Sequence, residues 1–402
     1  MTPRSESCTS MDRRTFEQRY LRLNKLVGVL SGLWPGQSKI SKTLTSIVTY
    51  TLVIESFVVQ VAHVVRDYSF DRLIAQIPYL CLALLVVGKH VNYTLYGTKV
   101  KELLNIIVKD WEVQRSKEEL TILENYSNRA ALLSMIYTVC IFSSSFMFSI
   151  QPAVPHVLDV LIPLNESRGR VLVYPAYFFM DEEKYYYFII INEMMGSLAI
   201  FLVFSSCDMY LVWFIQHASC KLAINWYNFQ KTMAEVCTCG KENKHLGANK
   251  TYSKVCLIIT DHQRVVEYIE TVAACHVTVF IVIVASVIFT FTVTLVKISQ
   301  FEMTLQYVTF CVFLFAQVIH LLFICCMGQY LNDAIAESYN KIYESKWYNG
   351  STRTQLLYQL VLRKYLSFPK ITAGGIIPMD LNTFVQIIKA SFSYYTVLKS
   401  TN

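Results

Sequence analysis

The last apolar stretch of the chain, Ile376–Lys399, and the residues just after it carry small or polar residues at three- and four-residue spacing. At this spacing the side chains share one face of a helix. In a membrane, such a face lines a water-filled path while the other faces pack on protein. The alternative is that this face packs on a neighbouring helix. The residues on the line are Gln386, Ala390, Ser393, Val397 and Thr401.

Lys389 is the only Lys or Arg deep within this stretch. A charge inside a membrane is costly, so it needs a partner, a wet cavity or a functional role. Three carboxylates within or near the apolar stretches are candidate partners: Asp380, Glu193 and Asp208. We expect a structural ion pair, and a role in ion selectivity is the alternative.

The sequence contains no residue pattern typical of an enzyme or a metal site. It has no glycine-rich phosphate loop, and its eight histidines include no pair at metal-ligand spacing on one helix. The pair Cys237-Thr238-Cys239 lacks the second pair that a zinc site needs. We therefore expect no catalytic residue, no metal and no cofactor.

The composition indicates a membrane protein. Of the 402 residues, 54% are hydrophobic and only 16% are charged, whereas about a quarter are charged in a soluble domain. The net charge is +7, but Lys and Arg lie mainly between the apolar stretches. This placement indicates membrane-flanking charge rather than a nucleic-acid surface.

Seven stretches are long enough to cross a bilayer as helices, which takes about 20 mostly apolar residues. We predict an all-α polytopic membrane protein with seven transmembrane helices and long cytoplasmic helical extensions. The predicted spans are Leu44–Val65, Leu73–Tyr93, Ala130–Ile150, Tyr186–Ile215, Val272–Val296, Met303–Met327 and Ile376–Lys399.

The positive charges predict the orientation, because Lys and Arg concentrate in cytoplasmic connections. Of the 36 Lys and Arg residues, 28 lie in the N-terminal region or in the stretches Lys89–Arg129, Lys221–Arg264 and Lys341–Lys370, and seven lie in the other connections or at the C-terminus. We predict a cytoplasmic N-terminus and an extracellular C-terminus. A G-protein-coupled receptor has the reverse orientation and is the alternative. A transporter is less favoured, because no internal repeat is evident.

Two connections carry further signals. The connection 151–185 is predicted outside, and Asn165 begins an Asn-Glu-Ser sequon there, so we expect that it can be glycosylated. The connection 328–375 is too polar to span but has helical apolar spacing. We predict a cytoplasmic amphipathic helix whose apolar face another subunit could cover. The spacing is carried by Leu331, Ile335, Tyr339, Ile342, Leu356, Leu360 and Tyr365.

The C-terminal quarter resembles the insect odorant receptor family. The order and spacing of several short pieces carry this resemblance, together with the predicted topology and the length. The pieces are Met327-Gly328-Gln329-Tyr330-Leu331, Ser338, Lys346-Trp347-Tyr348, Phe368-Pro369, Ala373-Gly374-Gly375, Leu381-Asn382-Thr383-Phe384 and 389–398.

The resemblance implies an odorant- or pheromone-gated, non-selective cation channel. It implies a ligand-tuned subunit that forms a heterotetramer with the odorant co-receptor (Orco) in the plasma membrane of sensory-neuron dendrites. In this family the last span lines the pore, which places Val397 at a hydrophobic gate. One turn later this chain has Thr401, where the co-receptor pattern has leucine.

The family resemblance places a pocket in the outer half of the bundle, between spans two, three, four and six. Its aromatic and Met walls with a few hydroxyls suit a small hydrophobic ligand. Ordinary helix packing is the alternative for each residue. The predicted ligand-binding residues are Ile77, Leu80, Phe142, Ser145, Phe146, Ser149, Tyr187, Ile191, Met194, Met195, Tyr307, Phe310 and Cys311.

These expectations divide the chain into four parts. Residues 1–43 are a cytoplasmic N-terminal region, and residues 44–327 are a six-helix ligand-binding bundle with cytoplasmic loops 94–129 and 216–271. Residues 328–375 are cytoplasmic anchor helices at the subunit contacts. Residues 376–402 are the pore-lining helix and a short extracellular end.

Overall fold

The computed structural model describes residues 11–66, 68–162, 168–238, 244–300 and 305–401, and these are almost entirely helical. Within these ranges the regular strands are β1 (Thr372–Ala373) and β2 (Ile377–Pro378), which pair antiparallel. The all-α prediction is confirmed. The α-helices are α1 (Arg13–Tyr20), α2 (Arg22–Leu30), α3 (Lys39–Arg66), α4 (Phe70–Leu95), α5 (Gly97–Glu112), α6 (Lys117–Ser149), α7 (Val154–Leu161), α8 (Tyr186–Thr238), α9 (Lys244–Gln300), α10 (Leu305–Tyr343), α11 (Thr352–Tyr365) and α12 (Leu381–Thr401), with short 3-10 turns at η1 (Gln151–Ala153) and η3 (Trp347–Asn349).

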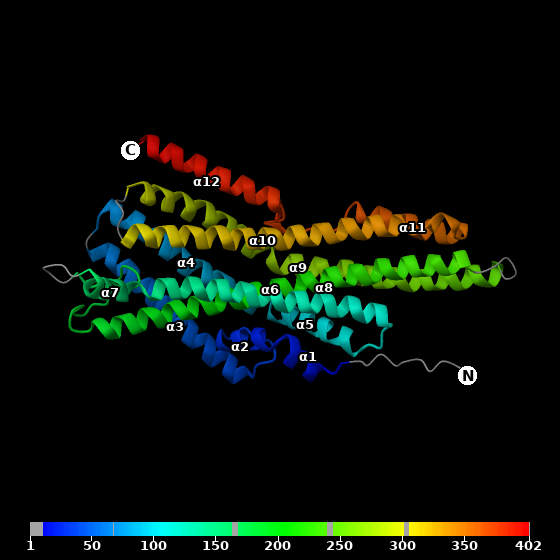
Figure 1. Ribbon diagram of the computed structural model, residues 1–402, viewed down its shortest axis with the longest axis horizontal. Helices are drawn as coiled ribbons and strands as arrows, with labels where there is room; N and C mark the ends of the chain where they lie inside the picture. The colour runs from blue at the N-terminus through cyan, green and yellow to red at the C-terminus, as the bar shows by residue number, and fades with distance from the viewer. Residues whose placement is uncertain (1–10, 67, 163–167, 239–243, 301–304, 402) are drawn as a thin grey trace.

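Six helices within the described ranges are long and apolar enough to cross a membrane: α3, α4, α6, α8, α9 and α10. They run along the long axis of the molecule (Figure 1). Each overlaps one of the first six predicted spans. Helix α6 ends at Ser149, one residue before the predicted end of the third span, and the first two residues of the sixth span lie outside the described residues. The seventh predicted span corresponds to α12, which carries more polar residues and is not among the six. That α12 crosses the membrane stays a prediction.

Helix α8 is the centre of the bundle. In its most apolar window 83% of the residues are buried, against 28% for α4 and for α6. It contacts α6, α10, α9, α3, α2 and α4. Because neighbours surround α8, its sequence is apolar on nearly every face, as expected of a helix buried all round.

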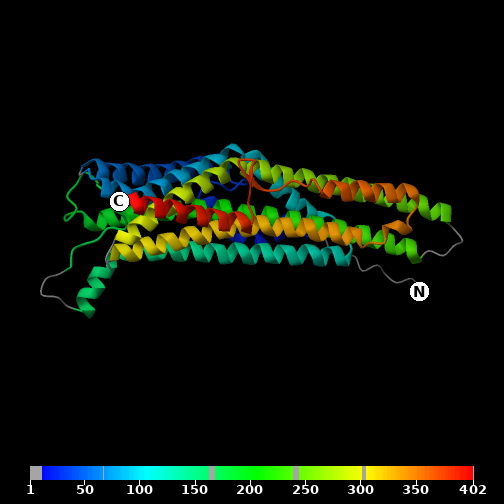
Figure 2. The same ribbon diagram turned by 90° about the horizontal axis from the view of Figure 1, so that it is seen from above.

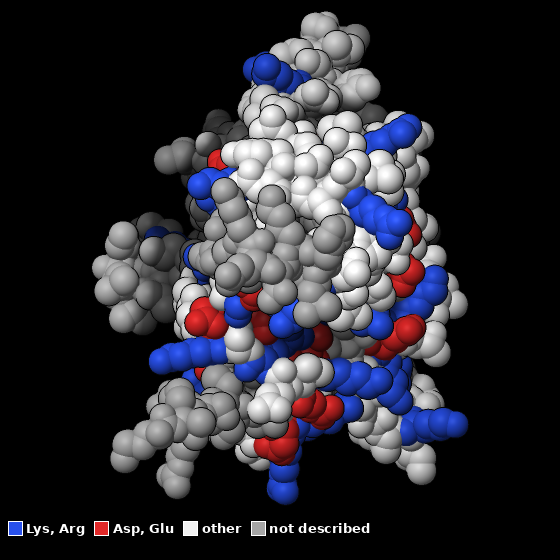
Figure 3. All heavy atoms as spheres, turned by 90° about the vertical axis from the view of Figure 1, so that its right-hand side faces the viewer, with Lys and Arg blue, Asp and Glu red and all other residues white. Residues whose placement is uncertain are grey.

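Helices α8 and α9 are much longer than a bilayer is thick. They contain 53 and 57 residues, and at a rise of about 1.5 Å per residue this is more than twice the roughly 30 Å hydrocarbon core. Their far ends lie beside α10 and α11 at one end of the molecule (Figures 1 and 2). Charged side chains of both signs gather over much of this end (Figure 3). The predicted helical extensions are confirmed, and their cytoplasmic location stays a prediction.

A turn separates α10 and α11 from α12. Gly374 and Gly375 have φ values of 62° and 76°, a left-handed region that glycine adopts without strain. The predicted seventh span started at Ile376, but α12 begins only at Leu381. The intervening residues form β2 and its turn, and Asp380 Oδ1 accepts a hydrogen bond of 2.9 Å from the backbone N–H of Thr383 at the start of α12.

Gly328 in α10 lies directly against the backbone that leads into α12. A Cβ atom at this position would lie 1.7 Å from the carbonyl oxygen of Met379. A backbone atom cannot move aside as the end of a flexible side chain can, so the junction between α10 and α12 requires glycine here.

We predict that Gly328→Ala lowers the free energy of unfolding by about 1–3 kcal/mol, because the added methyl group forces α10 and the α12 junction apart. Thermal denaturation of the purified protein in detergent measures this. Gly88→Ala in α4 is the control, because a Cβ there meets nothing within 4 Å. Equal melting temperatures for the two variants would contradict the assignment.

Candidate functional site

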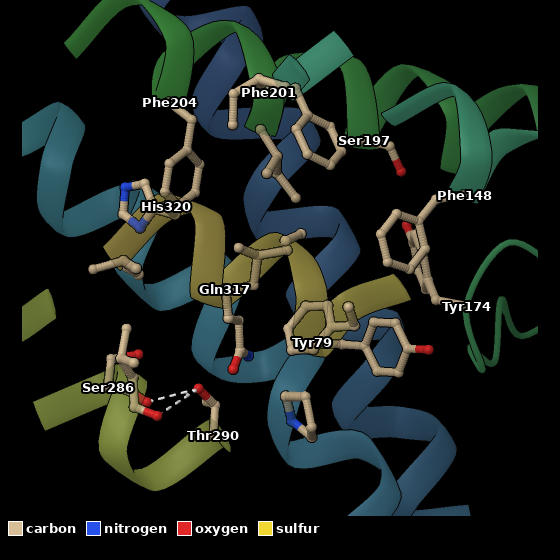
Figure 4. A pocket seen from close by; sticks show the side chains of 18 of the residues that line it. Tyr79, Phe148, Tyr174, Ser197, Phe201, Phe204, Ser286, Thr290, Gln317 and His320 are labelled. Atoms are coloured by element: carbon tan, nitrogen blue, oxygen red, sulfur yellow. Dashed lines mark hydrogen bonds between the residues drawn. The ribbon is translucent and has the colours of Figure 1, made fainter. Parts of the chain in front are cut away.

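A cavity of about 110 Å³ lies within the helical bundle (Figure 4). Helices α4, α6, α8, α9 and α10 supply most of its walls, and α3 and the segment before α8 supply the rest. The lining residues are Gln60, Pro78, Tyr79, Leu82, Leu85, Ile141, Phe148, Val173, Tyr174, Ser197, Ile200, Phe201, Phe204, Ser286, Val287, Thr290, Phe313, Ala316, Gln317 and His320.

Aromatic rings dominate the cavity walls. The ring of Phe313 lies 6.0 Å from that of Tyr79 and 6.2 Å from that of Phe148, measured between centroids. Phe201 and Phe204 face the cavity from α8 (Figure 4). Apolar walls with a few polar groups are what a site for a small hydrophobic molecule requires.

The segment before α8 closes one side of the cavity. Its Val173 N–H donates a hydrogen bond of 2.9 Å to Glu193 Oε2 in α8. The hydroxyl of Tyr174 donates one of 3.0 Å to Ser56 Oγ in α3. All four residues are buried, so these bonds hold the segment firmly over the cavity.

A buried charged cluster lies beside the cavity. Lys89 Nζ donates to both carboxylate oxygens of Asp208, at 2.8 and 2.9 Å, and the two residues are 1% and 3% exposed. Nε2 of His320 lies 3.2 Å from Asp208 Oδ2, and the hydroxyl of Tyr137 donates to the same oxygen. The cluster therefore joins α4, α6, α8 and α10 at one point.

Two residues belong both to this cluster and to the cavity wall. His320 lines the cavity and contacts Asp208 and Lys89. Phe204 lines the cavity, and Lys89 Nζ lies 4.3 Å from its ring centroid, at cation–π distance. A molecule in the cavity would thus touch side chains that hold the buried ion pair.

A second charged cluster lies farther along the bundle, where α5 meets α8. Lys221 Nζ donates to Asp110 Oδ2 at 2.8 Å, Nε2 of His217 lies 3.0 Å from the same oxygen, and Arg115 bonds the other oxygen. Burial works to raise the pKa of Asp110, but the hydrogen bonds and charges of His217 and Lys221 outweigh burial and hold this pKa well below its ordinary value. The cluster ties the extension of α8 to α5.

The thirteen predicted ligand-binding residues lie on the helices that form the cavity, but none of them is among its lining residues in the described part of the chain. Ser145 and Phe310 are buried elsewhere in the bundle. Ile77, Leu80, Phe142, Ser149, Tyr307 and Cys311 are half-buried. Phe146, Tyr187, Ile191, Met194 and Met195 are exposed on the outside of the single chain. Their role in binding stays a prediction.

Sequence reasoning missed the residues that line the cavity, although some carried a signal. Gln60 and Gln317 are amides within apolar stretches, where a polar side chain marks a buried function. Lys89 was counted among the membrane-flanking charges, but the structure buries it against Asp208. Helix α9 also lines the cavity, through Ser286 and Thr290. Nothing in its sequence marked these two residues as part of a binding site.

The predicted pore residues lie on the face of α12 that points away from the bundle. Thr383, Ile387 and Ser391 are buried and form the opposite, packed face. The Thr292 hydroxyl of α9 donates to the Ser391 carbonyl at 3.3 Å. Gln386, Lys389, Ser393 and Val397 are exposed in the single chain, and Ala390 is half-buried. The side chain of Thr401, like Asn165, lies outside the described residues.

The candidate partners of Lys389 all bond elsewhere. Asp208 pairs with Lys89, Glu193 accepts from Val173, and Asp380 accepts from Thr383. The expected ion pair between Lys389 and one of these three carboxylates is therefore not formed in the structure.

The fold and the cavity define a multi-pass helical membrane protein with a mainly apolar cavity inside its bundle. The family model for the 7tm odorant receptors matches residues 69–392, so the chain belongs to the odorant receptor family. This is a family of receptors, not of enzymes.

Solved structures support the same fold. The insect olfactory receptor OR5 from Machilis hrabei, in complex with eugenol, superimposes with a TM-score of 0.76 at 12% identity, covering 97% of this chain and 100% of that chain. Another structure of OR5 from Machilis hrabei gives 0.74 with the same identity and coverage. Among curated protein sequences, none matches this chain.

We predict that Asp208→Asn destabilises the protein by about 3–5 kcal/mol, because it leaves the Lys89 charge buried without a counter-charge. The melting temperature of the purified receptor measures the loss. The matched control is Arg264→Ala, whose ion pair with Asp261 is exposed and contributes less than about 1 kcal/mol. An Asp208→Asn protein as stable as the control would contradict a structural role for the pair.

Proposed function

We propose that this chain is the ligand-tuned subunit of an odorant- or pheromone-gated, non-selective cation channel. It acts with the odorant co-receptor (Orco) in a heterotetramer in the plasma membrane of sensory-neuron dendrites. The observation that carries the proposal is the cavity with aromatic walls between the membrane helices of a chain in the odorant receptor family.

The cavity is the proposed odorant site. Its walls are mainly apolar, and its few polar groups include Gln60, Ser197 and Gln317, a composition that suits a small hydrophobic molecule with one polar group. The similar OR5 receptor was solved in complex with eugenol. The thirteen residues predicted from the sequence remain a competing set on the same helices.

Helix α12 is the proposed pore helix. One face of α12 packs against α9 and α10. The other face carries the predicted pore residues from Gln386 to Ser393. Val397 is 59% exposed in the single chain. In a tetramer this face would meet its counterparts around a central path, where an apolar ring blocks ions by dewetting.

Helices α10 and α11 offer the proposed subunit contact. Leu331 and Ile342 of the predicted amphipathic segment are buried within the chain, but Leu356 and Leu360 are 58% and 54% exposed, one turn apart on α11. Exposed apolar side chains at this spacing are typical of a surface that another subunit covers.

The proposed orientation places α11 in the cytoplasm and the end of α12 outside the cell. These two elements lie at opposite ends of the molecule (Figure 1), and the excess of Lys and Arg is predicted to be on the α11 side. A G-protein-coupled receptor needs the reverse orientation, and the family match does not favour it.

We predict that Ala316→Phe raises the odorant concentration for half-maximal current roughly tenfold or more, because the added ring fills space in the cavity. Cells that express the receptor with the co-receptor provide the measurement, with surface expression as the control. Met194→Ala and Tyr307→Ala test the competing set. If they shift potency and Ala316→Phe does not, the odorant binds outside this cavity.

We predict that Val397→Ala increases current in the absence of odorant, because a smaller side chain at the constriction lets water and ions enter more readily. Whole-cell recording with the co-receptor measures this leak. Leu398→Ala on the next helix position is the control. Leak and gating equal to those of the unaltered channel would exclude Val397 from the gate.

A further inference from the structure

Two amide side chains in the cavity wall present oxygens that have no partner. Oε1 of Gln60 in α3 and Oε1 of Gln317 in α10 are buried without a hydrogen bond among the described residues. Gln60 is only 3% exposed. Figure 4 shows Gln317 extending from α10 into the lined space.

Several other polar groups of the wall bond within the protein. The Thr290 hydroxyl donates to the Ser286 carbonyl at 2.7 Å (Figure 4), and the Tyr174 hydroxyl donates to Ser56. His320 is engaged by the Asp208 cluster. Among the wall residues, the side-chain oxygens of Gln60 and Gln317 are thus buried acceptors that a ligand in the cavity could satisfy.

A buried acceptor without a partner is costly, and a ligand that supplies a donor removes this cost. A ligand with no donor leaves the oxygens unpaired and displaces any water that served them. The cavity thus distinguishes ligands by the presence of a hydrogen-bond donor as well as by size and apolarity.

We infer that the preferred ligand is a small hydrophobic alcohol or phenol, whose hydroxyl donates to Gln317 or Gln60. This inference rests on the proposed odorant site and specifies the chemical class that the site selects. Hydrocarbons and ethers of the same size fit the aromatic walls but cannot supply the donor.

Isomeric pairs of compounds test this inference, because they share composition and nearly share volume. One pair is phenylethanol and benzyl methyl ether, and another is octanol and heptyl methyl ether. Stabilisation of the purified receptor against heat reports binding without requiring channel activity. We expect each alcohol to bind roughly tenfold more tightly than its ether isomer.

Gln317→Met and Gln60→Met remove an amide while keeping an unbranched side chain of similar length. We expect at least one of these variants to lose the preference for the alcohol while still binding the ether. Gln306→Met is the matched control, since Gln306 is exposed on the same helix as Gln317 and does not line the cavity. It should keep the preference.

The outcomes separate this inference from the proposed function. Equal affinity for alcohol and ether, a preference for the ether, or a preference that survives both Met substitutions overturns the hydroxyl specificity but leaves the cavity as the odorant site. Binding of none of these compounds overturns the cavity as an odorant site and the specificity with it.

Discussion

The ion pair between Lys89 and Asp208 is the constraint around which the bundle is arranged. Both charges lie inside helices that are apolar enough to cross a membrane, where an unpaired charge is costly. The two charges neutralise each other only when α4 and α8 pack together. Tyr137 of α6 and His320 of α10 also contact Asp208, so these two helices meet at the same point. Four helices therefore share one fixed relative position, which hydrophobic contacts with little directional preference would specify less sharply.

This fixed point lies beside the cavity. The aromatic rings of Tyr79, Phe204 and Phe313 line the space next to this cluster. The segment held by Glu193 then covers that space. His320 therefore belongs both to the cavity wall and to the cluster that holds four helices together.

The single chain leaves two apolar or mixed surfaces without a neighbour. One is the outward face of α12, and the other is the face of α11 that carries Leu356 and Leu360. They lie at opposite ends of the molecule (Figure 1). In the proposed heterotetramer, neighbouring subunits would cover both surfaces.

Apolar stretches were sufficient to predict the class of fold and the first six spans, because apolar length and period are local properties of a chain. Short motifs predicted the family, and they include Gly328 and Gly374-Gly375, for which the structure shows the close contact with Met379 and the left-handed turn that require glycine. Which face of each helix points inward, by contrast, depends on the packing of the whole bundle. In a helix apolar on all sides the sequence does not mark that face, so Met194 and Ile191 were predicted in place of Phe201 and Phe204. The pairing of Lys89 with Asp208 was equally hidden, since 119 positions separate them along the chain and only the packing of α4 on α8 brings them together.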